Sequence, residues 1–229
     1  MLTNLRRLIC LGIGFSCYAL VLSGQTKTID GTLNSKVTSF EVNGESLSRC
    51  FQVLTSKNDF IVGFESVPQE LQDQADGITL RVNNSTVRNL IYKFIEKDPR
   101  YTWTPTDVGI SVFPLTSRED WMDTVVEEFK VDNVNREEAV NALLRLPETQ
   151  SQVARTALRR REIQSFPGIA PSDLTRFSLD LHRVTPRLAL SAIAQADHTH
   201  VWMFARYGRN KEYFSITFTN HFNQVRRRS

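Results

Sequence analysis

The residues best suited to chemistry are three histidines in the last quarter of the chain, His182, His198 and His200. His198 and His200 alternate, so on a strand they would point to one face, and a third ligand from a neighbouring strand would complete a metal site. No cysteine or carboxylate lies beside them at ligand spacing. The pattern therefore favours ordinary strand histidines over a metal site, and it predicts no cofactor.

Catalytic patterns are also absent. Cys50 lies on the apolar stripe of a predicted helix, whereas a nucleophilic thiol needs an accessible, electropositive setting with a histidine partner. The acid pairs Glu127-Glu128 and Glu137-Glu138 are adjacent in sequence, so their carboxylates do not converge as an acid/base pair must. There is no phosphate loop, nucleophile elbow or His-Glu-x-x-His motif. We expect a protein that is not an enzyme, although a site assembled from distant residues would leave no local motif.

Clustered arginines form a different kind of candidate. A predicted helix over residues 152–164 carries Arg155, Arg159, Arg160 and Arg161, and the tail carries Arg226–Arg228. Such runs can contact anionic lipid head groups or an acidic partner. The pattern favours the ordinary interpretation, which is a solvated helix face and a charged tail.

The first 24 residues predict export. Arg6 and Arg7 precede the apolar run Leu8–Leu22, and Ser23-Gly24 follows it, which is the order of a secretory signal peptide. The run is shorter than the roughly 20 residues of a membrane-spanning helix. We expect a periplasmic or envelope-associated protein, with membrane association only through an uncleaved signal or the basic segments. The chain has 28 basic and 25 acidic residues, and losing two arginines leaves it near neutral, which argues against nucleic-acid binding.

An internal repeat is the strongest structural signal. Residues 78–103 align with residues 177–202 at a constant offset of 99, without a gap. The identities are Leu80/Leu179, Thr86/Thr185, Arg88/Arg187, Asp98/Asp197 and Trp103/Trp202. Each copy predicts an alternating strand, a threonine that caps a helix, a helix with one apolar stripe, and a strand that carries the tryptophan. We expect the two tryptophans to fill equivalent gaps in the core.

A shorter version of this unit precedes each copy. Phe40–Val42 is followed by the capping residue Ser46 and an apolar helical stripe, and Phe129–Val131 is followed by Asn135 and another stripe. The sequence predicts an α+β fold of two tandem small domains, in which repeated strand–helix–strand units place helices on small sheets. The domains span residues 37–115 and 124–222, the second with an insertion at 147–176. Residues 116–123 connect them.

Residues 38–113 resemble a known family. The segments FEVNGESLSRCFQVLTSKNDFIVGFES, LRVNNSTVRNLIYKFIEKDPRYTW and ISVFP are similar to the short amino-terminal domain of secretins and TonB-dependent receptors. The resemblance implies two helices packed with small sheets, a role in docking onto other periplasmic proteins, and no catalytic residues. A channel or receptor function is not expected, because no channel-forming region follows the matched residues in this sequence.

These observations lead to two functional hypotheses. The first is a non-catalytic docking module that binds envelope proteins through exposed sheet edges, with Phe40, Val42, Phe214, Ile216 and the arginines of the insertion as contact residues. The alternative is a periplasmic protein that binds a small ligand in a groove between the two copies. That groove would be lined by Trp202, Phe204 and Tyr207.

Overall fold

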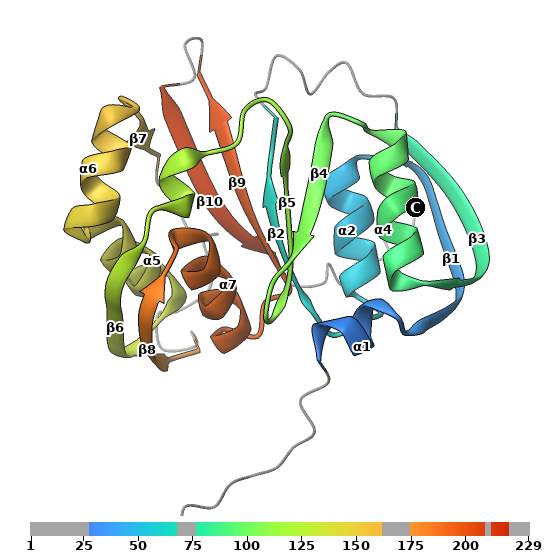
Figure 1. The fold of residues 1–229 in the computed structure, drawn as a ribbon, viewed down its shortest axis with the longest axis horizontal. Helices are drawn as coiled ribbons and strands as arrows, with labels where there is room; N and C mark the ends of the chain where they lie inside the picture. The colour runs from blue at the N-terminus through green and yellow to red at the C-terminus, as the bar shows by residue number, and fades with distance from the viewer. Residues whose placement is uncertain (1–27, 68–76, 162–174, 209–211, 220–229) are drawn as a thin grey trace, which may run out of the picture.

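Two small two-stranded sheets flank a central six-stranded sheet in the computed structural model of the chain (Figure 1). The structure describes residues 28–67, 77–161, 175–208 and 212–219. The fold is mixed α+β, as the sequence predicts. The predicted signal peptide at residues 1–24 and the basic tail lie outside the described residues. Within the described ranges, no helix combines the length and apolar character needed to span a membrane.

Eight elements make up the first half of the chain. They are α1 (Ile29–Leu33), β1 (Lys36–Glu45), α2 (Leu47–Thr55), β2 (Ile61–Glu65), β3 (Ile78–Thr86), α4 (Val87–Lys97), β4 (Tyr101–Pro105) and β5 (Gly109–Pro114). β1 pairs with β3 as one small antiparallel sheet, and α2 and α4 lie between that sheet and the central one (Figure 1). The strand and helix order predicted for this half is confirmed.

The second half repeats this order with additions. Its elements are η1 (Asp120–Asp123), β6 (Val126–Val134), α5 (Arg136–Arg145), α6 (Pro147–Arg155), β7 (Arg159–Arg160), β8 (Phe177–Val184), α7 (Pro186–Ala196), β9 (Val201–Tyr207) and β10 (Tyr213–Thr219). β6 and β8 form the other small sheet. The register of the two small sheets agrees: Phe40 faces Val82 in one and Phe129 faces Leu181 in the other.

All four predicted helix starts are confirmed. In each case the side chain of the capping residue accepts a hydrogen bond from the backbone N–H three residues later, which satisfies a donor that the first turn leaves without a partner. The caps are Ser46 for α2, Thr86 for α4, Asn135 for α5 and Thr185 for α7. Asn135 also forms a capping box, because the Glu138 side chain accepts from its backbone N–H.

The central sheet is continuous across the two halves. Its strand order is β4-β5-β2-β9-β10-β7, so β2 of the first half pairs in parallel with β9 of the second. In each half the hairpin that follows the repeated helix pairs in parallel with the earlier strand, β2 with β5 and β7 with β10. The division into two domains stays a prediction, since the halves share this sheet.

Aromatic side chains fill the core on both sides of the sheet. Phe94 packs against Phe40 and Phe51 with ring centroids 5.4 Å apart in both pairs. In the other half, Trp121 packs against Phe204 and Phe214, each at 5.9 Å. Trp121 belongs to the predicted connection at residues 116–123, so this segment forms η1 and contributes to the core rather than acting as a linker.

The predicted helix over residues 152–164 is confirmed at residues 152–155 and is wrong at residues 156–161. α6 begins at Pro147 and ends at Arg155, and Ala157 then adopts the left-handed conformation with φ of 54°. This turn buries Leu158 and lets the next residues run as β7 beside β10. Arg159 and Arg160 therefore lie on a strand rather than on a helix with Arg155. Residues 162–174 of the predicted insertion lie outside the described ranges.

The expectation that Trp103 and Trp202 fill equivalent gaps is also wrong. Trp202 is fully buried because β9 has a neighbouring strand on both sides. Trp103 lies on β4, the first strand of the sheet, and is half-buried. Equivalent positions in the repeat thus differ because the sheet continues past one and not past the other.

Cys50 is buried in the core, and burial raises the pKa of its thiol from 9.0 to about 12. In a chain with Cys10 and Cys17 replaced by serine, we expect Cys50 to react at least about 100-fold more slowly with a thiol reagent in native buffer than in denaturant, because reaction requires opening of the core. Rapid native labelling would contradict the burial.

The same pKa shift predicts a pH dependence. Because the pKa is higher in the folded state, the contribution of this thiol to stability is fully present below pH 9 and is lost as the pH rises toward 12. The free energy of unfolding should therefore fall more steeply over this range in the parent than in a Cys50→Ala variant. The free energy of unfolding is measured by urea titration at each pH. The same pH dependence in the parent and in the Cys50→Ala variant would contradict the assignment.

Candidate functional site

The edge of the central sheet at β4 is open. Among the described residues, β4 pairs with β5 on one side and with no strand on the other. Hydrogen bonds from Leu115 N–H to Arg100 O and from Thr106 N–H to Gly109 O bracket the hairpin. Since the hydrogen-bonded pairs of an antiparallel ladder alternate, residues 102 and 104 face β5 and residues 101, 103 and 105 face away from it.

The outward backbone groups of this edge are mostly acceptors. The Tyr101 N–H donates to Asp98 O at 3.2 Å, which leaves the Tyr101 carbonyl facing outward. Trp103 presents both its N–H and its carbonyl. Pro105 presents a carbonyl and has no N–H to present, which fits the confinement of proline to sheet edges.

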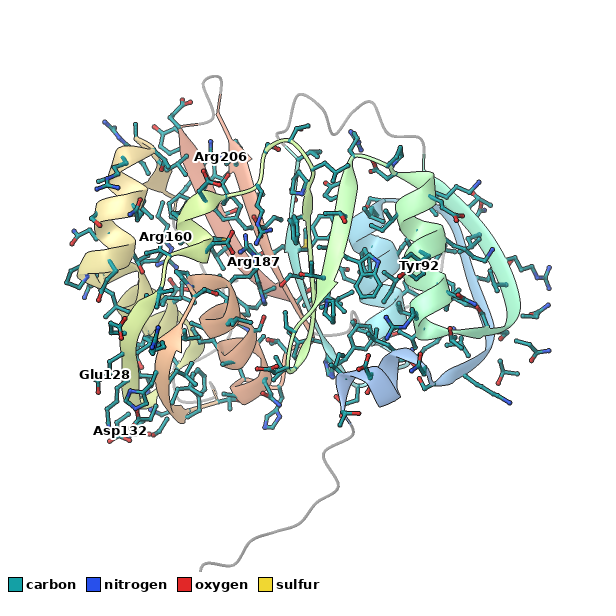
Figure 2. The ribbon with its side chains drawn as sticks, viewed as in Figure 1. Tyr92, Glu128, Asp132, Arg160, Arg187 and Arg206 are labelled. Carbon is teal, nitrogen blue, oxygen red and sulfur yellow. The ribbon has the colours of Figure 1, made fainter. Side chains whose placement is uncertain are left out.

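An aromatic surface lies directly beside this edge. The rings of Tyr92 on α4 and Trp103 on β4 meet edge to face, with centroids 5.5 Å apart. Tyr92 is 49% exposed and is labelled in Figure 2. The Arg88 guanidinium carbon lies 5.9 Å from the Trp103 ring centroid, and Arg88 also pairs with Asp30 at 2.8 Å. The surface therefore combines apolar rings, a cation and backbone carbonyls that no strand of the described residues covers.

The predicted edge residues lie elsewhere. Phe40 and Val42 are buried on β1, paired opposite Val82 and Leu80. Phe214 and Ile216 are buried on β10, and Phe214 also lies opposite Arg160 of β7. β10 is thus not an open edge at Phe214, because β7 covers it there. The structure does not bring these four residues together as one surface.

The four predicted arginines are also separated. Arg160 pairs with Glu137 at 2.5 Å and donates to the Asn141 side chain, so it ties β7 to α5. Arg155 donates to Gln152 within α6, and Arg161 lies 5.8 Å from the Tyr207 ring centroid. They therefore do not form one basic face.

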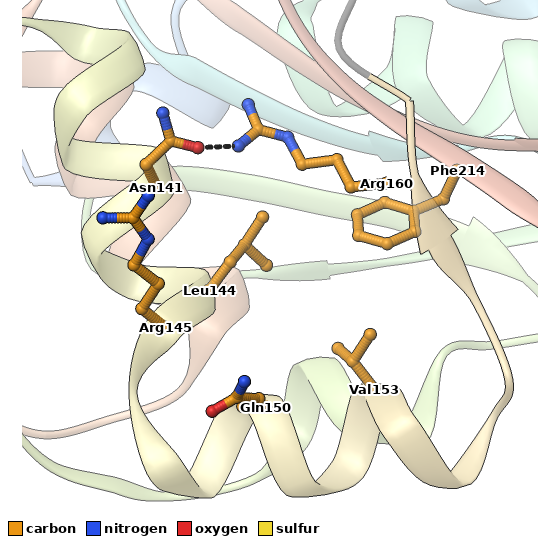
Figure 3. A pocket seen from close by; sticks show the side chains of 7 residues that line it. All are labelled: Asn141, Leu144, Arg145, Gln150, Val153, Arg160 and Phe214. Atoms are coloured by element: carbon orange, nitrogen blue, oxygen red, sulfur yellow. Dashed lines mark hydrogen bonds between the residues drawn. The ribbon is translucent and has the colours of Figure 1, made fainter.

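A small pocket lies where α5, α6 and β7 meet (Figure 3). Its volume is about 210 Å³, below the roughly 300–1,000 Å³ of typical small-molecule sites. It is lined by Asn141, Leu144, Arg145, Gln150, Val153, Arg160 and Phe214. The residues proposed for a groove between the copies do not line it. Trp202 and Phe204 are buried in the core, and Tyr207 stacks on Tyr213.

The histidines do not converge on a metal site. His198 lies in the turn before β9 with φ of 55°, so it does not alternate with His200 on a strand. His200 pairs with Asp59 at 3.4 Å, and His182 pairs with Asp180 at 3.1 Å on the exposed face of β8. Within the described ranges, no group of three potential ligands is placed to hold a metal ion.

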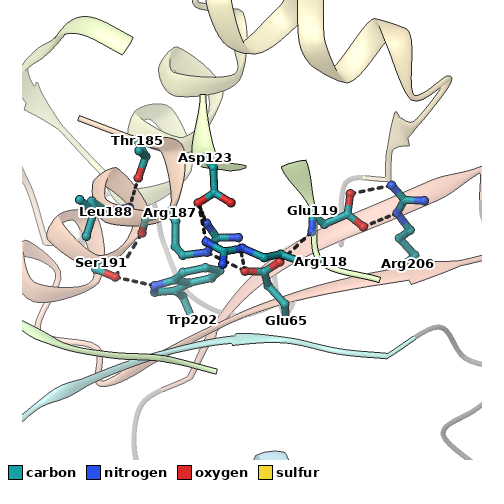
Figure 4. Close-up of polar contacts among 10 residues, drawn as sticks. All are labelled: Glu65, Arg118, Glu119, Asp123, Thr185, Arg187, Leu188, Ser191, Trp202 and Arg206. Carbon is teal, nitrogen blue, oxygen red and sulfur yellow. Dashed lines mark hydrogen bonds and ion pairs between the residues drawn. The ribbon is translucent and has the colours of Figure 1, made fainter. Parts of the chain in front are cut away.

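A buried charge network joins β2 to the second half (Figure 4). Glu65, at the end of β2, is 1% exposed, and Arg187 on α7 is 4% exposed. Two guanidinium nitrogens of Arg187, Nε and Nη2, each lie 2.7 Å from Glu65 Oε1. Arg187 also contacts Asp123 of η1, and the Glu119 N–H donates to Glu65 Oε2 at 3.3 Å.

The network extends along the same side of the sheet. Arg206 Nε and Nη2 lie 2.5 and 2.6 Å from the two carboxylate oxygens of Glu119. Burial raises the pKa values of Glu65 and Glu119, and the adjacent guanidinium groups of Arg187 and Arg206 oppose that shift. Because an unpaired buried charge is costly, each carboxylate depends on its arginine.

Sequence reasoning missed both the β4 edge and this network. Pro105, two residues after Trp103, was a signal for the edge, because a proline within a strand pattern indicates an edge strand. The alignment of Arg88 with Arg187 marked one member of the network. Its partners Glu65 and Asp123 are distant in sequence and carry no local pattern.

We predict that Glu65→Leu lowers the free energy of unfolding by about 3–5 kcal/mol, because the buried Arg187 loses its buried partner and retains the exposed carboxylate of Asp123. The double variant Glu65→Leu/Arg187→Met should lose much less than the sum of the single losses. Urea unfolding of all four chains measures this. Arg81→Met, which breaks an exposed pair with Glu41, should cost no more than about 1 kcal/mol and serves as the control. Additive losses at Glu65 and Arg187 would contradict the coupling.

Comparison with protein-family models, with curated proteins and with solved structures found no match to this chain. The candidate site therefore depends on the geometry of the chain itself: an open, acceptor-rich sheet edge with aromatic rings and an arginine beside it.

Proposed function

We propose that this chain is an exported, non-catalytic docking module that binds envelope proteins at the open edge of its central sheet. The observation that carries the proposal is the juxtaposition of the unpaired β4 edge with the exposed ring of Tyr92 and the half-buried ring of Trp103. An edge strand offers backbone groups that a partner strand can pair with, and adjacent pockets or rings give side-chain specificity.

The β4 edge also carries features that limit indiscriminate strand pairing. Proteins usually blunt free edges with proline, charge or short length, and β4 has both short length and Pro105. These devices limit indiscriminate pairing while three outward carbonyls remain available. A partner that supplies matching donors can therefore still add to the sheet.

The cellular location is part of the proposal. The order of basic residues, apolar run and small residues at positions 6–24 supports export. The resemblance of residues 38–113 to the amino-terminal domains of secretins and TonB-dependent receptors supports a periplasmic partner. We place docking ahead of small-ligand binding because Trp202 and Phe204, the rings proposed for a ligand groove, are buried.

Site-specific photocrosslinking in the native envelope tests this function. A photoreactive phenylalanine analogue at Tyr92 should crosslink a specific envelope protein. The same analogue at Asp132, on the exposed face of β6, should not crosslink that protein (Figure 2). Crosslinks of equal yield from both positions, or none from Tyr92, would contradict docking at this edge.

A further inference from the structure

The edge of β9 is equivalent to the open edge of β4 in the repeat, and β2 pairs with it. At the constant offset of 99, residues 101, 103 and 105 of β4 correspond to His200, Trp202 and Phe204 at the edge of β9. On β9 this edge is filled by β2. Val62 N–H donates to His200 O and Ser66 N–H donates to Phe204 O, both at 2.8 Å. The equivalent acceptors on β4 are the outward carbonyls of Tyr101 and Pro105.

The side chains above the two edges correspond as well. In the second half, Trp202 Nε1 donates to the Ser191 hydroxyl at 3.0 Å, and Arg187 lies one helical turn earlier on α7. In the first half, the same offset places Tyr92 beside Trp103 and Arg88 one turn earlier on α4. Both edges therefore carry a tryptophan, a helical partner for its ring and an arginine.

The strand that fills the β9 edge has two specific features. Gly63 lies opposite Trp202, and a Cβ at that position would lie 2.3 Å from the indole ring, so only glycine fits there. Two residues later, on the same side of the strand, Glu65 pairs with Arg187. The recognition pattern is a glycine against the tryptophan and a carboxylate against the arginine.

We infer that the β4 edge accepts, in parallel, an extended segment of a partner protein that reads apolar-glycine-apolar-acidic. The glycine would lie against Trp103 and the carboxylate would reach Arg88. This inference deepens the proposed docking function and depends on it for its biological role. Arg88 is available for exchange because both of its side-chain hydrogen-bond acceptors lie at the surface. The Asp30 side chain is 75% exposed, Asn34 is also exposed and accepts from Arg88 Nε at 3.4 Å, and exposed pairs contribute little.

A partner protein fits this edge better than a second copy of the chain. β2, the segment with the matching sequence Ile-Val-Gly-Phe-Glu, is paired on both sides in the middle of the sheet, so another copy cannot offer it without unfolding. The opposite end of the sheet is β7, whose exposed Arg159 would bring positive charge toward Arg88. The cation at Arg88 therefore favours an acidic segment from another protein.

Peptide binding tests the pattern directly. The probe is a fluorescently labelled peptide with the sequence of residues 60–67 and a neutral solubilising tail, titrated with protein produced from the full 229-residue chain. Fluorescence anisotropy should show saturable binding. A peptide carrying Gly63→Val should bind at least about tenfold more weakly, because its side chain would collide with the Trp103 ring.

A charge exchange assigns the site on the protein. Arg88→Glu in the protein should lower the affinity for the parent peptide at least about tenfold. A peptide carrying Glu65→Arg should restore binding to that variant. Arg81→Glu, on the exposed face of β3, should change nothing. Trp103→Pro removes the outward N–H and the ring without breaking the β5 ladder, and it should abolish binding. Equal binding of the parent and Gly63→Val peptides, or no effect of Arg88→Glu, would overturn the inference.

The two proposals fail separately. If Tyr92 crosslinks an envelope protein and the peptide does not bind, the docking function stands and the sequence pattern is overturned. If the peptide binds with the expected charge exchange and no envelope protein is crosslinked, the pattern stands and the docking function fails. Concentration-dependent dimers in sedimentation, lost in Arg88→Glu, would assign the edge to a second copy and overturn the choice of partner.

Discussion

The buried pair between Glu65 and Arg187 is the interaction on which the junction of the two halves depends. Removing two charges from water costs several kcal/mol per ion, and only close, well-oriented ion pairs and hydrogen bonds offset that cost. Those contacts exist only when β2 and β9 pair in one register. A slip of one residue would turn Glu65 to the other face of the sheet and move Gly63 away from Trp202. Charge and steric fit therefore specify the same alignment of the halves.

The repeated unit explains why similar residues have different roles. Arg187 and Arg88 occupy equivalent positions, as do Trp202 and Trp103, but within the described part of the chain a strand lies beside the second-half residues alone. Arg187 is consequently buried and forms an ion pair with Glu65. Arg88 is partly exposed and forms an ion pair with the exposed side chain of Asp30. The neighbouring strand, rather than the residue itself, decides between a structural and a surface role.

Local signals in the sequence predicted the elements well. Capping residues and apolar stripes act within one helix, so Ser46, Thr86, Asn135 and Thr185 could be identified without tertiary information. Strand order depends on contacts between distant residues, so the pairing of β2 with β9 could not be derived. For the edge at β4, Pro105 was a local signal. The arginine run was assigned to a helix because its polar pattern is compatible with one. The left-handed turn at Ala157, which is followed by the buried Leu158, ends that helical pattern.

The two edges of the central sheet differ in charge and in the backbone groups that they expose. At β7, Arg159 and Arg160 pair with β10, the Arg161 N–H donates to Phe214 O, and the strand carries positive charge. At β4 the outward groups are the carbonyls of Tyr101, Trp103 and Pro105 with a single N–H. An incoming strand must therefore supply more donors than acceptors at this edge. Pro105 removes one outward donor and leaves every outward acceptor of β4 in place. It therefore restricts which strands can pair with this edge but does not block pairing.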